Sequence, residues 1–220
     1  MKRSDKTFQT LRNILDLAVS EGFLTNNAAE DGIDHSKGYL FSHENSSFLK
    51  GFTNKDLAID LGSGGGLPGL VLATFTDFFW LLVDRSERRC SFLKKAVLDL
   101  ELNKRVEVVE CSAEELSRSG YRGKSRLVTA RSFGSPAITA ECASPLLRDD
   151  GLFIVSEPPV NNSTNNEDRW PVEGLLNLGL KQKEKWHTGL AGYRSFVCAA
   201  KCPEMYPRRF NKITKNPVFY

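Results

Sequence analysis

Five glycines fall within eight residues directly after a short apolar segment that holds one acid. The stretch "AIDLGSGGGLPGLVLA", residues 58–73, contains Asp60 and the glycines Gly62, Gly64, Gly65, Gly66 and Gly69. Glycine permits positive φ and carries no Cβ, so a ligand can approach the backbone closely. Since one or two glycines suffice for a tight turn, the run predicts a nucleotide-like ligand at this loop.

Two classes of ligand fit the loop. Residues 64–69 satisfy the dinucleotide pattern G-x-G-x-x-G, and Asp84 follows about 20 residues on, where an acid holds ribose hydroxyls. Residues 60–66 also read D-x-G-x-G-x-G, the usual first motif of S-adenosylmethionine-dependent methyltransferases. S-adenosylmethionine has no pyrophosphate, so it needs close backbone approach and a nearby acid more than a helix N-terminus. The glycines alone leave both ligands open.

The elements that position this loop follow a regular alternation. Strands are expected at residues 57–61, 79–84, 106–110, 126–130 and 152–156, with helices at 67–75, 88–102, 113–116 and 136–147. Apolar strands separated by helices indicate a parallel sheet that is covered on both faces. The sequence therefore predicts a doubly wound α/β domain, whose ligands bind beyond the carboxyl ends of the strands.

The remaining segments complete this domain. An amphipathic helix is expected over residues 7–19, and residues 24–54 are polar and irregular. Residues 157–171 are expected to form an exposed loop, followed by a helix at 172–179 and a hairpin of strands at 180–187 and 193–200. We divide the chain into an N-terminal extension, residues 1–54, and one domain, residues 55–220.

Composition narrows the class of protein. A chain of 220 residues, 40% hydrophobic and 26% charged, fits one globular domain. No apolar run approaches the ~20 residues of a membrane span, and the first residues are charged where a signal peptide is apolar, so we expect a cytoplasmic protein. The five cysteines contain no C-x-x-C pair and the three histidines are scattered, so we expect no metal site.

Positive charge is concentrated at the C-terminus. The formal net charge is +3, but residues 201–220 alone carry five Lys or Arg against Glu204. This basic tail suits a phosphate-rich partner, although a solvated tail that only keeps the protein soluble has the same composition.

Five motifs occur in a fixed order along the chain. They are "DLGSGGGLPG", "VDRSERRCSFL", "SAEEL", "TARSF" and "YPRRFNKITKNP". In these motifs the chain resembles the ribosomal RNA small subunit methyltransferase G family, also called glucose-inhibited division protein B. The likeness covers roughly residues 56–155 and the extreme C-terminus. It implies a class I (Rossmann-like) methyltransferase fold with a mostly parallel seven-stranded sheet. It also implies methyl transfer from S-adenosylmethionine to N7 of a guanine in small-subunit ribosomal RNA, free or in the subunit.

The resemblance assigns roles by position. Asp84 would hold the cofactor's ribose, while Ala113 and Glu114 would hold its adenine. Arg131, in "TARSF", would lie at the methyl-transfer site, where it contacts the cofactor and orients the guanine; a salt-bridging role at the strand end is the alternative. The cofactor loop would contribute Asp60, Gly62, Gly64, Gly66 and Leu67.

RNA contacts are expected in the basic tail. Tyr206 and Phe210 lie among the cations and would combine base stacking with phosphate neutralisation. Packing of these two aromatic side chains against the sheet is the alternative. The cations expected to contact RNA are Arg208, Arg209, Lys212 and Lys215.

The chain departs from the family pattern in two segments. The family motifs W-N-x-x-x-N-L-T and H-x-x-D-S are not clear in residues 35–51, and "SEPP", residues 156–159, replaces the family's Lys-Gly. These changes leave open a methyltransferase-fold protein that uses another acceptor or binds RNA without catalysis. A nicotinamide-dependent oxidoreductase is a third hypothesis, against which stands the lack of a Tyr-x-x-x-Lys motif.

Overall fold

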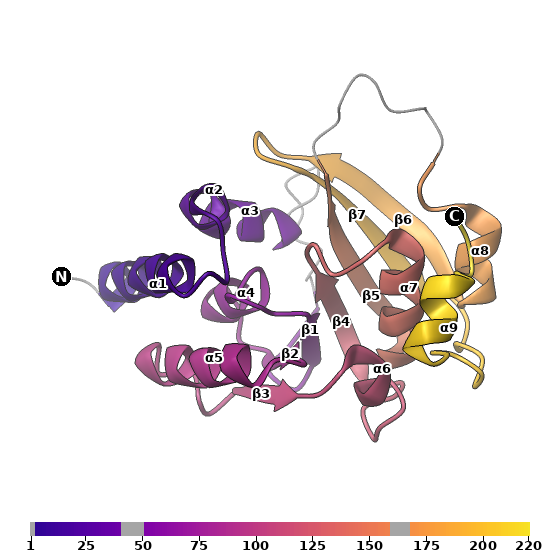
Figure 1. The fold of residues 1–220 in the computed structure, drawn as a ribbon, viewed down its shortest axis with the longest axis horizontal. Coiled ribbons are helices and arrows are strands. Elements are labelled where there is room, and N and C mark those ends of the chain that lie inside the picture. Colours follow the sequence, from indigo (N-terminus) through magenta and orange to yellow (C-terminus); the bar gives the residue numbers. More distant parts are fainter. Residues whose placement is uncertain (1–2, 41–50, 159–167) are drawn as a thin grey trace.

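One seven-stranded sheet organises the protein. The computed structural model describes residues 3–40, 51–158 and 168–220. The strand order is β3-β2-β1-β4-β5-β7-β6 (Figure 1). Strands β1 to β5 pair in parallel, whereas β7 pairs antiparallel with both β5 and β6. The strands are β1 Leu57–Leu61, β2 Phe79–Asp84, β3 Val106–Glu110, β4 Ser125–Ala130, β5 Leu147–Glu157, β6 Leu180–His187 and β7 Gly192–Cys198. The predicted doubly wound, mostly parallel α/β fold is confirmed.

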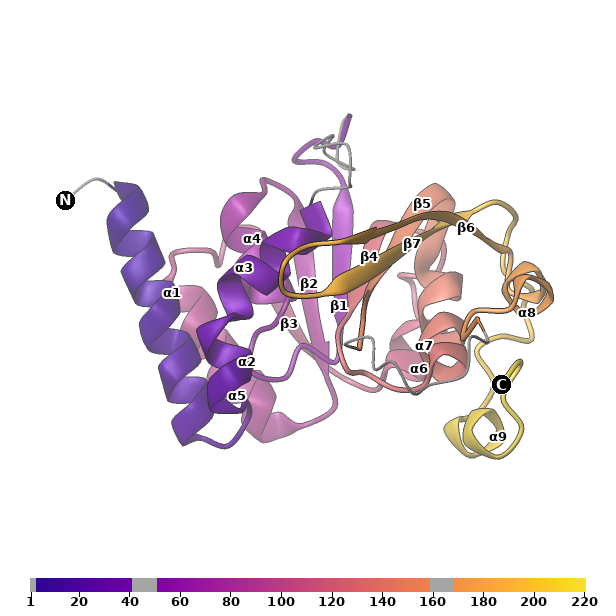
Figure 2. The ribbon, with the colours of Figure 1, turned by 90° about the horizontal axis from the view of Figure 1, so that it is seen from above.

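Helices cover both faces of the sheet (Figures 1 and 2). One face carries α1 Arg3–Ser20, α2 Asn26–Glu30, α3 Gly32–Lys37, the 3-10 turn η1 Gly38–Leu40, α4 Gly69–Phe75 and α5 Glu87–Asp99. The other face carries α6 Ala113–Leu116, α7 Pro136–Ala143, η2 Ser144–Leu146, α8 Val172–Asn177 and α9 Phe210–Lys215. Each face has its own apolar core. No helix in the described part of the chain is long and apolar enough to cross a membrane.

Residues 26–40 are helical, so the expectation of an irregular segment there is wrong. The Thr25 hydroxyl caps α2 by accepting the Ala28 N–H at 3.2 Å, and Ile33 and Tyr39 are buried. These helices are too short for a periodic pattern, and packing against the sheet stabilises them. The Tyr39 hydroxyl donates to the Ala130 carbonyl at 2.9 Å and accepts the Ser156 N–H at 3.1 Å. The N-terminal extension therefore packs at the carboxyl ends of β4 and β5. Residues 41–50 lie outside the described residues.

The helix expected over residues 136–147 is shorter in the structure than its apolar pattern predicted. α7 ends at Ala143, and β5 begins at Leu147, earlier than the expected residue 152. Pro145 has no N–H to donate to the preceding helical turn, which favours this early end. In the loop expected at 157–171, Glu157 completes β5 and residues 159–167 lie outside the described residues.

Candidate active site

Asp60, near the end of β1, anchors the loop that follows this strand. This side chain is fully buried; one carboxyl oxygen accepts the Gly69 N–H at 3.1 Å and the other accepts the Thr129 hydroxyl at 2.7 Å. Burial raises the pKa of Asp60 to about 6. Because both oxygens are engaged inside the protein, the Asp60 side chain shapes the loop.

Four of the residues assigned to the cofactor line one cavity of about 240 Å³, here called the Asp84 pocket. They are Gly62, Asp84, Ala113 and Glu114, from the loop after β1, the end of β2 and the start of α6. Gly62 has φ +70°, and a Cβ at this position would lie 2.8 Å from the Phe133 ring, so the site needs glycine. Carboxyl ends of neighbouring parallel strands meet at one edge, which is why these distant residues converge.

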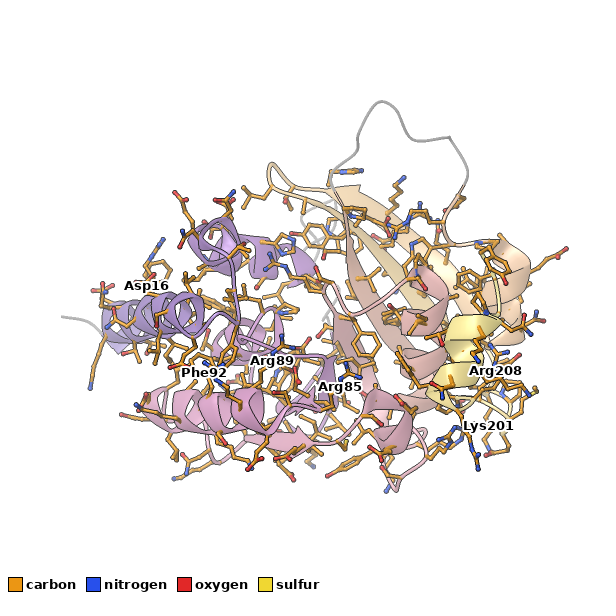
Figure 3. The ribbon with its side chains drawn as sticks, viewed as in Figure 1. Asp16, Arg85, Arg89, Phe92, Lys201 and Arg208 are labelled. Carbon is orange, nitrogen blue, oxygen red and sulfur yellow. The ribbon has the colours of Figure 1, made fainter. Side chains whose placement is uncertain are left out.

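The two acids of the Asp84 pocket differ in their partners. Asp84 is 5% exposed, and its carboxylate accepts the N–H groups of Gly64 at 3.0 Å and Ser86 at 2.9 Å. Arg89, labelled in Figure 3, lies 3.7 Å from the same carboxylate. Glu114 is half-buried, and its carboxylate forms no hydrogen bond or ion pair with the described residues. Asp84 is therefore fixed in place, while Glu114 is available to a ligand.

Other residues of the loop do not line this pocket. Gly64 and Gly66 have φ +52° and +100°, so they supply the turn that glycine allows. Leu67 is 5% exposed and packs against Gly32 at the start of α3. Its side chain belongs to the core, a placement that the loop motif did not indicate.

A second cavity of about 540 Å³, the Arg131 pocket, adjoins the first. It is lined by Arg131 together with His35, Glu157 and Trp170. Residues 132–134 line both pockets, and Ser132 among them has φ +51°. A non-glycine residue with positive φ is uncommon and occurs at functional sites. The two pockets thus share one wall, made by the last two residues of the "TARSF" motif and the glycine that follows it.

Arg131 and His35 bring unpaired polar atoms to the Arg131 pocket. Nη1 of Arg131 and Nδ1 of His35 are buried and have no hydrogen-bond partner among the described residues. Burial and the charge of Arg131 lower the pKa of His35 to about 4, so its ring is neutral near pH 7. Unpaired buried polar atoms cost free energy, which makes these two pocket-lining side chains candidates for pairing with a ligand. A salt bridge was the alternative role for Arg131, but no acid in the described part of the chain forms an ion pair with it.

His35 was not assigned a role from the sequence. It opens the stretch in which the family motifs are not clear, so no spacing marked it. Its place is set by Tyr193 of β7, whose hydroxyl donates to the His35 carbonyl at 2.7 Å.

Glu157, which departs from the family pattern, also lines the Arg131 pocket. Its carboxylate accepts the Trp170 indole N–H at 2.6 Å and lies 3.1 Å from Arg169 and 3.7 Å from Arg194. Two arginines therefore compensate the negative charge of Glu157. Glu157 does not line the Asp84 pocket.

The C-terminal cations divide into two groups. Arg208 forms a bidentate ion pair with the buried Glu141 of α7, at 2.9 and 2.7 Å (Figure 3 shows Arg208 beside α9). This ion pair gives Arg208 an internal partner, and its contact with RNA stays a prediction. By contrast, Arg209, Lys212 and Lys215 are exposed. Of the two aromatic residues in this segment, Tyr206 packs against the core and Phe210 is 40% exposed.

A third cavity of about 440 Å³, the basic pocket, lies between the residues that follow α6 and the C-terminal segment. Its cationic lining consists of Arg118, Arg122, Arg208, Arg209 and Lys212. In the described parts of the chain, no three His, Cys, Asp or Glu side chains are placed to hold a metal ion.

Comparisons with known proteins place the chain in a family. A family model for rRNA small subunit methyltransferase G matches residues 40–185. A ribosomal RNA small subunit methyltransferase G from Prochlorococcus marinus is 30% identical over 178 residues, covering 77% of this chain and 72% of the relative. Another, from Dictyoglomus thermophilum, is 32% identical over 171 residues, with 75% and 70% covered.

A solved structure shares the fold at lower identity. An aminoglycoside resistance methyltransferase superposes with a TM-score of 0.51 at 20% identity, covering 66% of this chain and 88% of that chain. The family match includes Asp84, Glu114 and Arg131, and the alignments cover more than two thirds of both relatives. This chain therefore belongs to the ribosomal RNA small subunit methyltransferase G family.

Proposed function

We propose that this protein transfers a methyl group from S-adenosylmethionine to N7 of a guanine in small-subunit ribosomal RNA. Family membership decides between the two ligands that the loop left open: the cofactor is S-adenosylmethionine. The observation that supports a separate site for the acceptor base is the wall shared by the two pockets. Residues 132–134 form this wall, with Asp84 and Glu114 in one pocket and Arg131 in the other.

The residues of the Asp84 pocket fit a nucleoside with a methionine side chain. The Asp84 carboxylate, anchored by Gly64 and Ser86, would accept ribose hydroxyls in charge-assisted hydrogen bonds. The Glu114 carboxylate has free lone pairs for the adenine amino group. Gly62 leaves room at the backbone. When bound, the sulfonium cofactor supplies an electrophilic methyl group.

The residues of the Arg131 pocket would orient the acceptor base. The planar guanidinium of Arg131 can hydrogen-bond to a guanine or stack on it, and its Nη1 has no partner among the described residues. The neutral ring of His35 lies in the same pocket and offers a further polar atom. Guanine N7 carries a lone pair and no proton, so alignment drives the transfer and no general base is required.

The RNA backbone would be held by the exposed cations of α9 and its cap. Arg209 and Lys212 line the basic pocket, and Lys215 is exposed at the end of α9. Positively charged side chains gathered on one surface bind phosphates with a strong dependence on salt. Arg208 supports this surface by fixing the segment to α7.

The proposal is tested by methyl incorporation into small-subunit RNA and assembled subunits, followed by mapping of the modified position. Arg131→Lys should keep cofactor affinity but lower single-turnover methyl transfer about tenfold or more, equal to a loss of ~1.4 kcal/mol of transition-state stabilisation. Lysine keeps the charge but lacks the planar group with several donors. The matched control is Arg148→Lys, at the opposite end of the sheet, where β5 begins.

Two results would contradict the proposal. Equal single-turnover rates for wild type and Arg131→Lys would make Arg131 a structural residue. No incorporation by wild type into any small-subunit substrate would favour another acceptor, and the change at Glu157 would then be the first place to examine.

A further inference from the structure

One residue of the Asp84 pocket comes from far along the chain. Phe210, the first residue of α9, lines this pocket together with Ala113 and Glu114. Its side chain is 40% exposed, so a large apolar ring stands at the rim of the pocket. An exposed aromatic ring beside a pocket that takes a flat base is placed to bury apolar area when that base binds.

The C-terminal segment before α9 is firmly anchored. Arg118 donates to the Pro207 carbonyl at 2.6 Å. The N–H and guanidinium of Arg208 both donate to the buried carboxylate of Glu141. Within α9, Ile213 is fully buried. These contacts from α7 and the residues after α6 hold Phe210 in place without using its own side chain.

The packing of α9 determines which side of the Asp84 pocket Phe210 occupies. α9 lies beside α7 and close to α6 (Figure 1), and Ile138 of α7 also lines the pocket. Glu114 projects from the first turn of α6. Phe210 and Ile138 thus add apolar surface on the side where Glu114 has a free carboxylate. A flat ring system that carries an amino group matches this pairing of apolar wall and hydrogen-bond acceptor.

We propose that Phe210 packs on the adenine ring of the cofactor, so that α9 forms part of the cofactor site. This inference rests on the proposed placement of adenine at Ala113 and Glu114. Phe210 and Lys212 belong to the same short helix, and Lys212 faces the basic pocket. α9 would therefore contribute to both the proposed cofactor site and the proposed RNA-binding surface.

The test compares ligands that share the adenine ring. Phe210→Ala, made in the full chain, should weaken S-adenosylmethionine and 5′-methylthioadenosine equally, each by roughly tenfold, in calorimetric titrations. Phe210→Trp should keep most of the affinity because a flat aromatic surface remains. The matched control is Phe75→Ala, since Phe75 is 45% exposed at the end of α4 and lines neither pocket.

The possible results distinguish a failure of the role proposed for Phe210 from a failure of the cofactor site. Unchanged affinity in Phe210→Ala, while Asp84→Asn binds more weakly, would overturn the role of Phe210 and leave the site standing. Weakened S-adenosylmethionine with unchanged 5′-methylthioadenosine would place the ring against the methionine part and also overturn the inference. If wild type binds neither ligand, the cofactor site and the inference both fail.

Discussion

The ion pair between Arg208 and Glu141 should contribute strongly to stability. Glu141 is completely buried and Arg208 is 12% exposed at the side chain, with donor–acceptor distances of 2.9 and 2.7 Å. In Arg208→Ala the carboxylate of Glu141 stays buried but loses its guanidinium. Removing one partner of a buried pair costs about 3–5 kcal/mol, mainly because the remaining charge is unpaired.

The local geometry places the cost near the lower end of that range. The backbone N–H of residue 208 donates to the same carboxylate at 2.7 Å, and this bond survives the substitution. We therefore expect Arg208→Ala to lower the free energy of unfolding by about 3 kcal/mol. This loss is a large fraction of the roughly 5–15 kcal/mol that stabilises a typical domain.

Urea denaturation at pH 7 measures this effect. The matched control is Arg209→Ala, because Arg209 is the exposed neighbour and forms no ion pair with the described residues; its change should stay within about 0.5 kcal/mol. The double variant Arg208→Met, Glu141→Leu should recover part of the loss, since no charge is then left buried but the N–H of residue 208 loses its acceptor. Equal urea midpoints for Arg208→Ala and wild type would refute the assigned role.

Three further expectations follow from the two pockets and the tail. Asp84→Asn should weaken S-adenosylmethionine binding by about 1.5–3 kcal/mol in calorimetry, because charge-assisted bonds to the ribose are lost; undiminished affinity would place the ribose elsewhere. The His35 ring should titrate with a pKa of about 4 by NMR, and a value near 6.5 would contradict its buried position beside Arg131. Since the unfolded chain then binds more protons between pH 4 and 6.5, stability should rise with pH in wild type relative to His35→Gln. Alanine at Arg209, Lys212 and Lys215 should reduce the salt slope of RNA binding by about two to three ions, and an unchanged slope would remove α9 from the interface. The control with the same charge change replaces the exposed Lys94, Lys95 and Lys104.

Much of the fold and part of the site could be predicted from the sequence, because both depend on local patterns. The run of apolar strands and amphipathic helices predicts the parallel sheet; Asp84 ends the second strand and Glu114 follows the third. Parallel strands bring their carboxyl ends to one edge, so order along the chain already implies that these acids meet. The glycine loop is likewise a local requirement of backbone conformation.

Only the tertiary structure decided which side chains are engaged and which are free. Arg208 and Arg209 are adjacent and chemically alike, yet Arg208 pairs with Glu141, 67 residues away, and Arg209 faces solvent. His35 reaches its pocket through a hydrogen bond from Tyr193, 158 residues away, and Phe210 reaches the Asp84 pocket because α9 packs on α7. Burial and pairing depend on contacts between distant segments, and these contacts exist only when the chain has folded, so no local pattern reports them.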